Sequence, residues 1–324
     1  MPAKSLKRKP SSRVKKAARF RVEEGQRKLV VILSRKRSLY STRRLVEATR
    51  KLGHRALVLD TLRCNMLLGP QGARMMYRGA EVKGVHVVIP RIGASITGYG
   101  LAVVNHFEMM GIPVANASGP IARSRDKLRC LQLLAQKGLA IPRTVMARDR
   151  SDVAQLVQEV GGLPAIIKLL RGTQGLGVMI ASSEAEVQTI LDTFWDLGQE
   201  IVLQEFIRES KGRDFRALVV GNQMVAAMRR QAKKGEFRSN LHRGGEGTPV
   251  TLSKEFAQAA VDAAQTIGLE IAGVDMLESD AGPKIIEVNS SPGFKGLETA
   301  TGQDIAGKIV AHALEFADLV WAAR

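Results

Sequence analysis

The apolar residues in the first third of the chain fall into short runs separated by longer amphipathic stretches. Four short runs, bounded by turn residues, predict strands at 29–33, 56–59, 85–89 and 113–116. Two longer stretches, ended by Gly53 and Gly111, predict helices at 42–52 and 101–110. Strands that alternate with helices favour a parallel sheet with helices packed on its faces. We therefore predict an α/β domain in this part of the chain.

The rest of the chain also alternates between apolar runs and helical periodicity. The predicted helices are 128–136, 151–160, 184–197, 253–267 and 302–323. The predicted strands are 143–147, 165–170, 201–207, 217–220, 225–228, 271–277 and 284–288. In the last helix, Ile305, Ile309, Ala313 and Phe316 recur at helical spacing, which indicates a face packed on the core. The last two strands flank a turn-rich connector and predict an antiparallel hairpin.

This hairpin carries polar oxygens in an otherwise apolar setting. Glu287 and Asn289 are two residues apart on one strand, so they point to the same face, and Asp275 on the other strand is expected to face them. Burying two carboxylates without compensation is costly, and a hard divalent cation such as Mg²⁺ or Mn²⁺ would provide it. A hairpin whose acids lie at solvated ends explains the same residues, so the pattern alone leaves both interpretations open.

A glycine-rich segment, Arg-Gly-Thr-Gln-Gly-Leu-Gly-Val at 171–178, follows the predicted strand that carries Lys168. Glycines let main-chain N–H groups close around phosphate oxygens, and the lysine adds positive charge. No Gly-Lys-Ser/Thr follows, so the segment is not a P-loop. It is either a nucleotide-binding loop or the turn of a β-hairpin.

The first domain offers one further hint of a ligand site. Arg91, Gly93 and Thr97 follow the predicted strand at 85–89, and ligand sites of α/β proteins gather at the carboxyl ends of strands. The first predicted strand is not followed by Gly-x-Gly-x-x-Gly, so the sequence does not support dinucleotide binding.

The overall composition is that of a globular protein that stays inside the cell, and we expect a cytoplasmic location. The chain has 324 residues, of which 45% are hydrophobic. No apolar run approaches the roughly 18 residues that a membrane span requires, and the N-terminus lacks a secretory apolar segment. Cys64 and Cys130 are far apart and form no metal-binding motif, so we expect them to be reduced and packed.

Positive charge is concentrated at the N-terminus. Residues 1–28 contain eleven Lys and Arg and two Glu, a net charge of +9, which is half of the +18 of the whole chain. With few large apolar residues, this basic arm is predicted to be disordered when isolated. It is a solvated tail, a transit peptide, or an arm that binds a polyanion such as RNA through counterion release.

The order of the motifs is more specific than any one of them. They are Ile-Leu-Ser-Arg, Ile-Pro-Arg-Ile-Gly, Ala-Arg-Ser-Arg-Asp-Lys-Leu-Arg, the glycine-rich segment, Leu-Gln-Glu-Phe, Arg-Asp-Phe-Arg, Arg-Ser-Asn-Leu-His-Arg-Gly-Gly, Gly-Val-Asp and Glu-Val-Asn-Ser-Ser-Pro-Gly. In this order they resemble the ATP-grasp superfamily and, within it, the RimK family of ribosomal-protein α-L-glutamate ligases. The resemblance covers residues 29–316.

The resemblance implies an α/β and α+β architecture. A parallel-sheet pre-ATP-grasp domain would be followed by a two-lobed ATP-grasp fold, whose α+β lobes hold ATP between them. The corresponding domains are a basic arm at 1–28, the pre-ATP-grasp domain at 29–117, the central lobe at 118–207 and a C-terminal lobe with the metal site at 208–324.

The resemblance also implies roles for individual residues. The ATP site would comprise Lys127, Lys168, Gly172, Thr173, Gln174, Gly175, Gly177, Gln204, Glu205, Phe206, Asp214, Arg238, Ser239 and Asn240. Two Mg²⁺ or Mn²⁺ ions would be bound by Asp275, Glu287 and Asn289. Arg216 and Arg230 are the candidates for stabilising charge on the transferred phosphoryl group and the tetrahedral intermediate.

Simpler interpretations exist for some of these residues. Arg229 and Arg230 are alternatively a solvated pair at a strand end. Asp214 is alternatively an ion-pair partner of Arg213 or Arg216. His242 is either a substrate contact or a structural hydrogen-bonding residue.

The function implied by the resemblance is ATP-dependent addition of L-glutamate to the C-terminus of a small-subunit ribosomal protein through an acyl phosphate. The basic arm would contact RNA or the ribosome, no membrane is involved, and the family suggests a homotetramer. Two alternatives remain: a glutamate ligase with another acceptor, such as a carrier protein or a small peptide, and an RNA-binding protein with an inactive ATP-grasp body.

Overall fold

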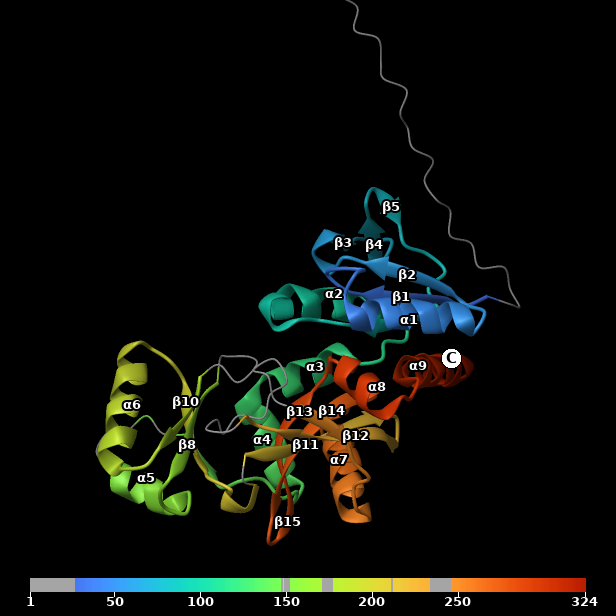
Figure 1. Cartoon of the computed structure of the whole chain (residues 1–324). Helices are drawn as coiled ribbons and strands as arrows, with labels where there is room; N and C mark the ends of the chain where they lie inside the picture. Colours follow the sequence, from blue (N-terminus) through green and yellow to red (C-terminus); the bar gives the residue numbers. More distant parts are fainter. Residues whose placement is uncertain (1–26, 147, 149–151, 171–176, 211, 234–245) are drawn as a thin grey trace, which may run out of the picture.

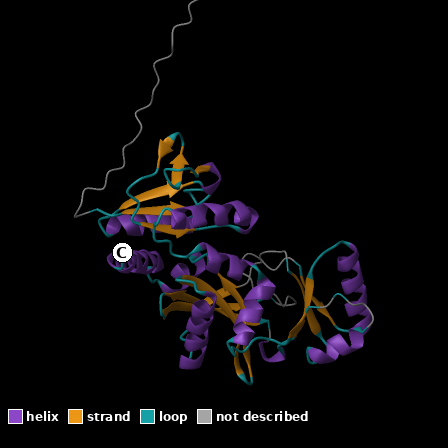
Figure 2. Cartoon of the chain, turned by 180° about the vertical axis from the view of Figure 1, so that it is seen from behind, coloured by secondary structure: helices purple, strands orange, loops and turns teal. Residues whose placement is uncertain are grey.

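The computed structural model describes residues 27–146, 148, 152–170, 177–210, 212–233 and 246–324. Figure 1 shows an N-terminal domain above two further lobes, with helix α9 (Ile305–Ala322) between that domain and the C-terminal lobe. The same layers of helices and sheets are visible from behind in Figure 2.

A three-stranded parallel sheet forms the centre of the N-terminal domain. Its order is β2-β1-β6, with β1 at Leu29–Leu33, β2 at Arg55–Leu59 and β6 at Val87–Pro90. Alternate residues of β1 face two different cores, one shared with helix α1 (Tyr40–Lys51) and the other with helix α2 (Thr97–Met109). The predicted α/β arrangement is therefore confirmed. The predicted strand at 113–116 is reduced to one parallel bridge between Val88 and Val114.

A small antiparallel sheet between β2 and β6 was not among the predicted elements. Its order is β3-β4-β5, with β3 at Cys64–Leu67, β4 at Arg74–Tyr77 and β5 at Ala80–Glu81. Only one residue each of β3 and β4 is buried, so these strands lack the apolar run or strict alternation by which a strand is recognised. Short 3₁₀ turns in the described residues lie at Thr61–Arg63, Ala94–Ile96 and Arg208–Ser210.

The central lobe begins with two helices and continues as an antiparallel sheet. Helices α3 (Ser118–Arg125) and α4 (Lys127–Gln136) precede the sheet. The sheet order is β7-β10-β8-β9, with β7 at Thr144–Val145, β8 at Ala165–Leu169, β9 at Val178–Ala181 and β10 at Ile201–Glu205. Helices α5 (Val153–Glu159) and α6 (Glu184–Asp196) cover one face and share its core. Ile167 and Leu203 belong to that core, so their neighbours Lys168 and Gln204 point to the opposite face.

The C-terminal lobe is a five-stranded antiparallel sheet of order β13-β12-β11-β14-β15. Its strands are β11 at Arg213–Val220, β12 at Gln223–Gln231, β13 at Glu246–Pro249, β14 at Ile271–Ser279 and β15 at Gly282–Asn289. Helix α7 (Lys254–Ile267) packs on one face through its alanines and Ile267. The hairpin predicted at 271–288 is thus confirmed as β14 and β15.

The other face of this sheet is apolar in one half of its strands and polar in the other half. Leu218 and Met228 lie in an apolar half that is covered by α8 (Lys295–Thr301) and α9. This core also includes Ile32 and Leu45 of the N-terminal domain, so α9 joins that domain to the C-terminal sheet. The polar half of the face is turned toward the central lobe. Within the described residues, no helix has the length and apolar character needed to cross a membrane.

Candidate active site

The polar half of the C-terminal sheet presents a row of charged side chains. Cross-strand neighbours are Asp214 with Arg230, Arg216 with Asp275, and Asp275 with Glu287. Directly opposite residues share a face, and Asn289 lies two residues beyond Glu287 on that face. The register therefore confirms the predicted position of Asp275 opposite Glu287.

Two arginines compensate the buried carboxylates of this row. Arg230 donates from Nε and Nη2 to Asp214, both at 2.6 Å, and its Nη2 lies 2.9 Å from Asp275 Oδ2. Arg216 donates from Nε and Nη2 to Asp275, at 2.7 and 2.6 Å. Burial would raise the pKa of Asp275, but Arg216 and Arg230 outweigh it and hold the pKa below its usual value. The charge on Asp275 is therefore balanced by protein groups alone.

This network shows which of the alternative interpretations applies to Asp214, Arg229 and Arg230. Asp214 pairs with Arg230 and not with Arg213 or Arg216. Arg229 is exposed at the strand end whereas Arg230 is buried, so the interpretation as a solvated pair holds only for Arg229. Burial would lower the pKa of Arg230, but Asp275 and Asp214 raise it above its usual value. Arg230 is therefore a permanently charged part of the sheet.

The central lobe contributes two lysines that face Glu287. Lys168 Nζ donates to Gln204 Oε1 at 2.5 Å, and Lys127 Nζ donates to the main-chain oxygen of Leu169 at 3.2 Å. Burial lowers the pKa of both lysines, that of Lys168 to about 8, and the negative charge of Glu287 opposes the decrease in each case. The structure thus brings together Lys127, Lys168 and Glu287 from three separate elements.

The segment Gln204–Phe206 at the end of β10 connects the two lobes. Glu205 Oε2 accepts from Lys284 Nζ of β15 at 2.8 Å and from the main-chain N–H of Arg143 at 2.9 Å. Burial would raise the pKa of Glu205, but these two partners lower it below its usual value. Gln204 is buried and also donates to Thr144 Oγ1 at 2.8 Å, whereas Phe206 is half-buried. The predicted hinge residues therefore lie at the junction of the lobes.

Part of the predicted nucleotide site lies outside the described residues, namely Gly172, Thr173, Gln174, Gly175, Arg238, Ser239, Asn240 and the neighbouring His242. Gly177, at the start of the described part, has φ +78°. A Cβ there would lie 2.9 Å from Leu169 Cβ, so only glycine fits this close approach to β8.

Two arginines near the site were not among the predicted site residues. Arg91 follows β6 and donates from Nη2 to the main-chain oxygen of Pro292 at 2.6 Å. Arg125 ends α3 and donates to the main-chain oxygen of Ile92. In the sequence, Arg91 was marked by its position at a strand's carboxyl end and by its place in the Ile-Pro-Arg-Ile-Gly motif.

The oxygen donors on β14 and β15 fit a magnesium ion. No group of three or more His, Cys, Asp and Glu side chains forms a metal cluster in the described ranges. Mg²⁺, however, is usually bound by one or two carboxylates together with water and substrate phosphates. Asp275 and Glu287 supply two carboxylates, and Asn289 adds a carboxamide oxygen two residues beyond Glu287 on the same strand. The donor set therefore suits a metal that a phosphate ligand shares.

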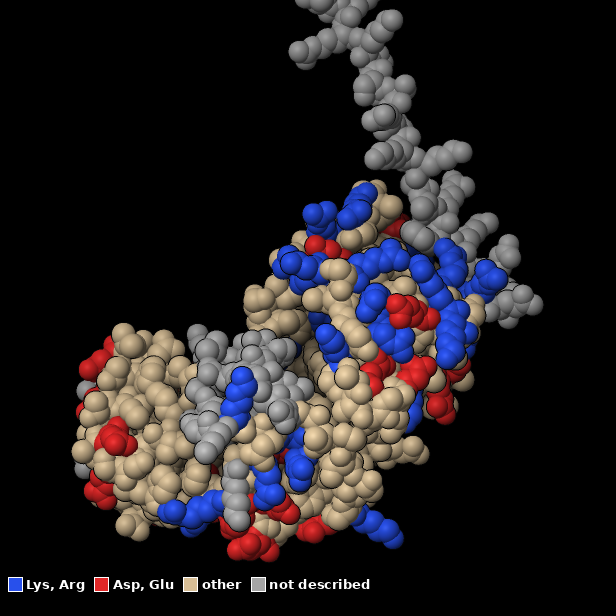
Figure 3. Space-filling model, viewed as in Figure 1, with Lys and Arg blue, Asp and Glu red and all other residues tan. Residues whose placement is uncertain are grey.

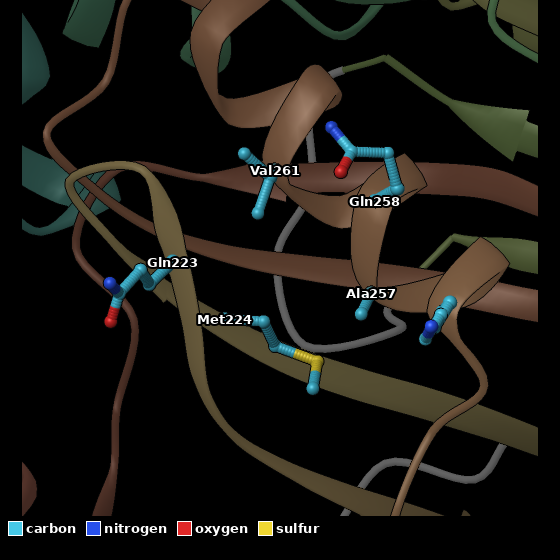
Figure 4. A pocket seen from close by; sticks show the side chains of 6 residues that line it. Gln223, Met224, Ala257, Gln258 and Val261 are labelled. Atoms are coloured by element: carbon cyan, nitrogen blue, oxygen red, sulfur yellow. The ribbon is translucent and has the colours of Figure 1, made fainter.

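The two cysteines and the pocket of Figure 4 lie apart from this chemistry. Burial raises the pKa of the Cys64 and Cys130 thiols to about 12, so neither is a thiolate at neutral pH. The pocket has a volume of about 420 Å³ and lies between β12 and α7, where Figure 4 shows Gln223, Met224 and Gln258 around it. No residue of the charged row lines it.

Comparison with known proteins identifies the family. Residues 29–121 match the RimK PreATP-grasp domain, and residues 124–313 match the RimK-like ATP-grasp domain. The chain belongs to the RimK-like ATP-grasp family. The predicted family, the pre-ATP-grasp and ATP-grasp architecture, and the class of ATP-dependent ligase are thereby confirmed. The domain boundaries and the roles of individual residues stay predictions.

Relatives at about half sequence identity cover most of the chain. The "Probable alpha-L-glutamate ligase" of Ectopseudomonas mendocina is 50% identical over 283 residues, which are 87% of this chain and 94% of the relative. The protein of the same name from Chromohalobacter salexigens is 52% identical over 281 residues, 87% of this chain and 93% of the relative.

Solved structures of ATP-grasp ligases share the fold. The ligase PsnB in complex with a minimal precursor is 24% identical, with a TM-score of 0.71, and the match covers 90% of this chain and 98% of that one. The macrocyclase MdnC from Microcystis aeruginosa, bound to its precursor peptide MdnA, is 18% identical, with a TM-score of 0.70, covering 89% and 99% of the two chains.

Proposed function

We propose that the protein is an ATP-dependent α-L-glutamate ligase that adds glutamate to the C-terminus of a small-subunit ribosomal protein. The observation that carries the proposal is the convergence of Lys127 and Lys168 of the central lobe on Glu287 of the C-terminal lobe. Cations on one lobe that face metal-type oxygen donors on the other suit a bound triphosphate.

In the proposed site, ATP lies between the lobes. Lys127 and Lys168 hold its phosphate oxygens, and the glycine-rich segment that ends at Gly177 covers them. The segment Gln204–Phe206 recognises the adenine. Asp214, which is fixed by its ion pair with Arg230, helps to hold the nucleoside. The residues Arg238, Ser239 and Asn240 are proposed to complete the nucleotide site.

We propose that Asp275, Glu287 and Asn289 hold Mg²⁺. More specifically, we propose that two ions bind at this site and that Mn²⁺ can take the place of Mg²⁺. When bound, the metal neutralises charge on the β- and γ-phosphates. Arg216 and Arg230 keep Asp275 ionised and fixed in position, so this ligand is ready before the nucleotide arrives. Arg216, which is only partly buried, is the better candidate for direct contact with the transferred phosphoryl group.

The proposed reaction has two steps. An oxygen of the acceptor's C-terminal carboxylate attacks the γ-phosphorus of ATP, the bond to the β,γ-bridging oxygen breaks, and ADP leaves. The amine of glutamate then attacks the carbonyl carbon of the acyl phosphate, inorganic phosphate leaves, and the amine loses a proton as the amide forms. No side chain becomes a covalent nucleophile, in keeping with the buried thiols. The protein supplies positioning and fixed charges.

The choice of glutamate is supported by the name that relatives at about 50% identity carry. A peptide acceptor is supported by the solved ligases of this fold, which are bound to precursor peptides. A different acceptor, such as a carrier protein or small peptide, is the second candidate, because these solved structures are complexes with precursors and not with ribosomal proteins.

ADP release tests the proposed function. The wild-type protein with ATP, Mg²⁺ and glutamate is expected to release ADP rapidly only when an acceptor is present, and mass spectrometry should find the acceptor heavier by one or more glutamyl residues. Incubation with a mixture of ribosomal proteins identifies the acceptor. If only carrier proteins or small peptides are modified, the acceptor belongs to that class and is not a ribosomal protein. Tight RNA binding without glutamate-dependent ADP release would contradict ligase activity.

The basic arm at 1–28 is proposed to bring the enzyme to RNA. Residues 29–117 contain thirteen Lys and Arg and four Asp and Glu, a net charge of +9, so the arm and the N-terminal domain together account for the whole net charge of +18. Figure 3 shows Lys and Arg side chains gathered over this domain on the visible face. A polyanion would be attracted to this end of the molecule.

Deletion of residues 2–27 tests the arm. The deletion retains Lys28, which pairs with Asp318 at 2.5 Å. It should weaken binding to ribosomal RNA and flatten the dependence of binding on salt, because fewer counterions are released. Ligation to a free acceptor peptide should persist and serves as the control. Unchanged RNA binding, measured across a range of salt concentrations, would contradict the proposal.

A further inference from the structure

We propose that Arg91 and Arg125 form a binding site for a substrate carboxylate, beside Glu287 and on the side of the N-terminal domain. The identity of the substrates rests on the proposed function. The carboxylate belongs either to the incoming amino acid or to the acceptor, and the experiment below distinguishes these two sources.

The two arginines approach the end of β15 from different elements. Arg91 reaches it from the N-terminal domain, where its Nη2 contacts the main-chain oxygens of Pro292 and Ser291. Its guanidinium also lies 5.7 Å from the centre of the Phe294 ring. Arg125 lies at the end of α3, two residues before Lys127. The pair therefore stands where the N-terminal domain, α3 and β15 meet.

Neither arginine is matched by a buried carboxylate. The partners that the structure gives them are main-chain oxygens, and no ion pair to either guanidinium occurs within the described ranges. Burial, together with the nearby charge of Arg125, lowers the pKa of Arg91 to about 10. Burial also lowers the pKa of Arg125, and the negative charge of Glu287 opposes it. Two like charges are thus held close together at half-buried positions, which is costly unless an anion joins them.

Buried hydrogen-bond donors without partners also lie at the end of β15, near Arg91 and Arg125. Arg125 Nε, Asn289 Nδ2 and the hydroxyls of Ser290 and Ser291 are buried and lack a hydrogen-bond partner in the part of the chain that the structure describes. Nearly all buried polar atoms of native proteins are paired, so a group of such atoms indicates a missing acceptor. A carboxylate offers two oxygens with about four lone pairs and matches the fork of a guanidinium.

The charged residues along the site offer separate positions for the phosphates of ATP and for a substrate carboxylate. Glu287 acts on Lys127, Lys168 and Arg125, and Arg125 in turn acts on Arg91. Glu287 therefore lies near the two lysines and near Arg125. With the phosphates on the lysines, the arginines are left for the substrate that meets the phosphoryl group beside Glu287.

A purely structural role explains less of the arrangement. Main-chain oxygens need only neutral donors, and Asn116 already joins the domains: its Nδ2 donates to Ile271 O at 2.8 Å and to Ser290 O at 2.9 Å. A second and third connection would not need two charged groups at this point.

Steady-state kinetics with Arg125→Gln and Arg125→Lys test the site. Arg125→Gln is expected to raise the KM of one carboxylate-bearing substrate about tenfold or more, because a charge-assisted hydrogen bond is lost. The KM of ATP should change less than about threefold. Arg125→Lys keeps the charge and should recover part of the loss. A selective rise in the KM of glutamate identifies the incoming amino acid, and a selective rise in the KM of the acceptor identifies its carboxylate.

Arg123→Gln is the matched control. Arg123 lies in the same helix and also donates to a main-chain oxygen, that of Ile267, at 3.0 and 2.8 Å. It should leave both substrate KM values unchanged. Equal effects of Arg123→Gln and Arg125→Gln, or a KM increase confined to ATP, would overturn the proposal. Melting temperatures of all three variants identify any general loss of folding.

A binding measurement without turnover keeps this inference separate from the proposed function. Glutarate, which carries two carboxylates and no amine, is expected to raise the melting temperature of the wild-type protein in the presence of ADP and Mg²⁺, but not that of Arg125→Gln. If the wild type fails to use glutamate yet shows this shift, the proposed function is wrong and the carboxylate site stands. The absence of a shift in the wild type, together with unchanged KM values in the variant, would overturn the site itself.

Discussion

Replacing Glu287 with Gln is expected to reduce glutamate-dependent ADP release at least about a hundredfold, while the melting temperature stays close to that of the wild type. The side chain of Glu287 is exposed, so its replacement removes little packing. Its importance comes from its charge, which faces Lys127, Lys168 and Arg125. Loss of the carboxylate removes a proposed metal ligand while keeping the shape of the side chain.

Nucleotide binding provides a second readout for Glu287→Gln. In the absence of metal, the carboxylate opposes the negative charge of the phosphates. The variant should therefore bind ADP without Mg²⁺ at least as tightly as the wild type. The gain in affinity that Mg²⁺ gives the wild type should be largely lost, as calorimetry with and without the metal would measure.

Glu278→Gln is the control for this variant. Glu278 lies on the same hairpin near its turn, is exposed, and is 3.6 Å from Arg213. It should retain wild-type turnover. Turnover at the wild-type level in Glu287→Gln, or an equal decrease in both variants, would contradict the assignment of Glu287 to the metal site.

Local patterns predicted the elements of the fold well where the apolar periodicity was strong. Strand Leu29–Leu33 has the predicted bounds, and α4 and α7 begin within one residue of their predicted starts. The small sheet β3-β4-β5 was missed because its strands are only half buried. Helix α3 was missed for a related reason, since glycine and proline occupy its first turn.

The partners of the charged residues could not be predicted, because they depend on the lateral order of the strands. In sequence, Asp214 is closest to Arg213 and Arg216, yet it pairs with Arg230 from the neighbouring strand β12. Likewise Asp275 receives two arginines because β14 lies directly beside β11. From the sequence, a metal was expected to compensate the charge of Asp275, whereas the structure adds guanidinium groups that balance this charge before any metal binds.

Arg91 and Arg125 illustrate the same limit. They are 34 positions apart in the numbering and belong to different domains, and no spacing rule connects them. Only the contact between the N-terminal domain and the end of β15 brings them together. The motifs around them were recognised through the resemblance, but their shared charge and unpartnered donors emerge from the three-dimensional structure.

Replacing Arg230 with Met is expected to destabilise the protein by about 3–5 kcal/mol, measured as a lower melting temperature and a lower midpoint of urea unfolding. Asp214, Arg230 and Asp275 are all buried, with 3 to 4% of their surface exposed. In the variant, Asp275 keeps its pair with Arg216, but the described structure gives Asp214 no other cation. An ionised carboxylate would be left in the interior without a partner, and its desolvation is not offset.

The double variant Arg230→Met with Asp214→Asn separates this cause from a simple loss of packing. The neutral amide removes the uncompensated charge, so the double variant should be clearly more stable than Arg230→Met alone. A cavity left by the shorter Met side chain would instead destabilise both variants equally. Arg229→Met, at the exposed neighbouring position on β12, should change stability by less than about 0.5 kcal/mol. If Arg230→Met is as stable as Arg229→Met, the network does not hold this sheet together, and Arg230 would be free to act on substrate instead.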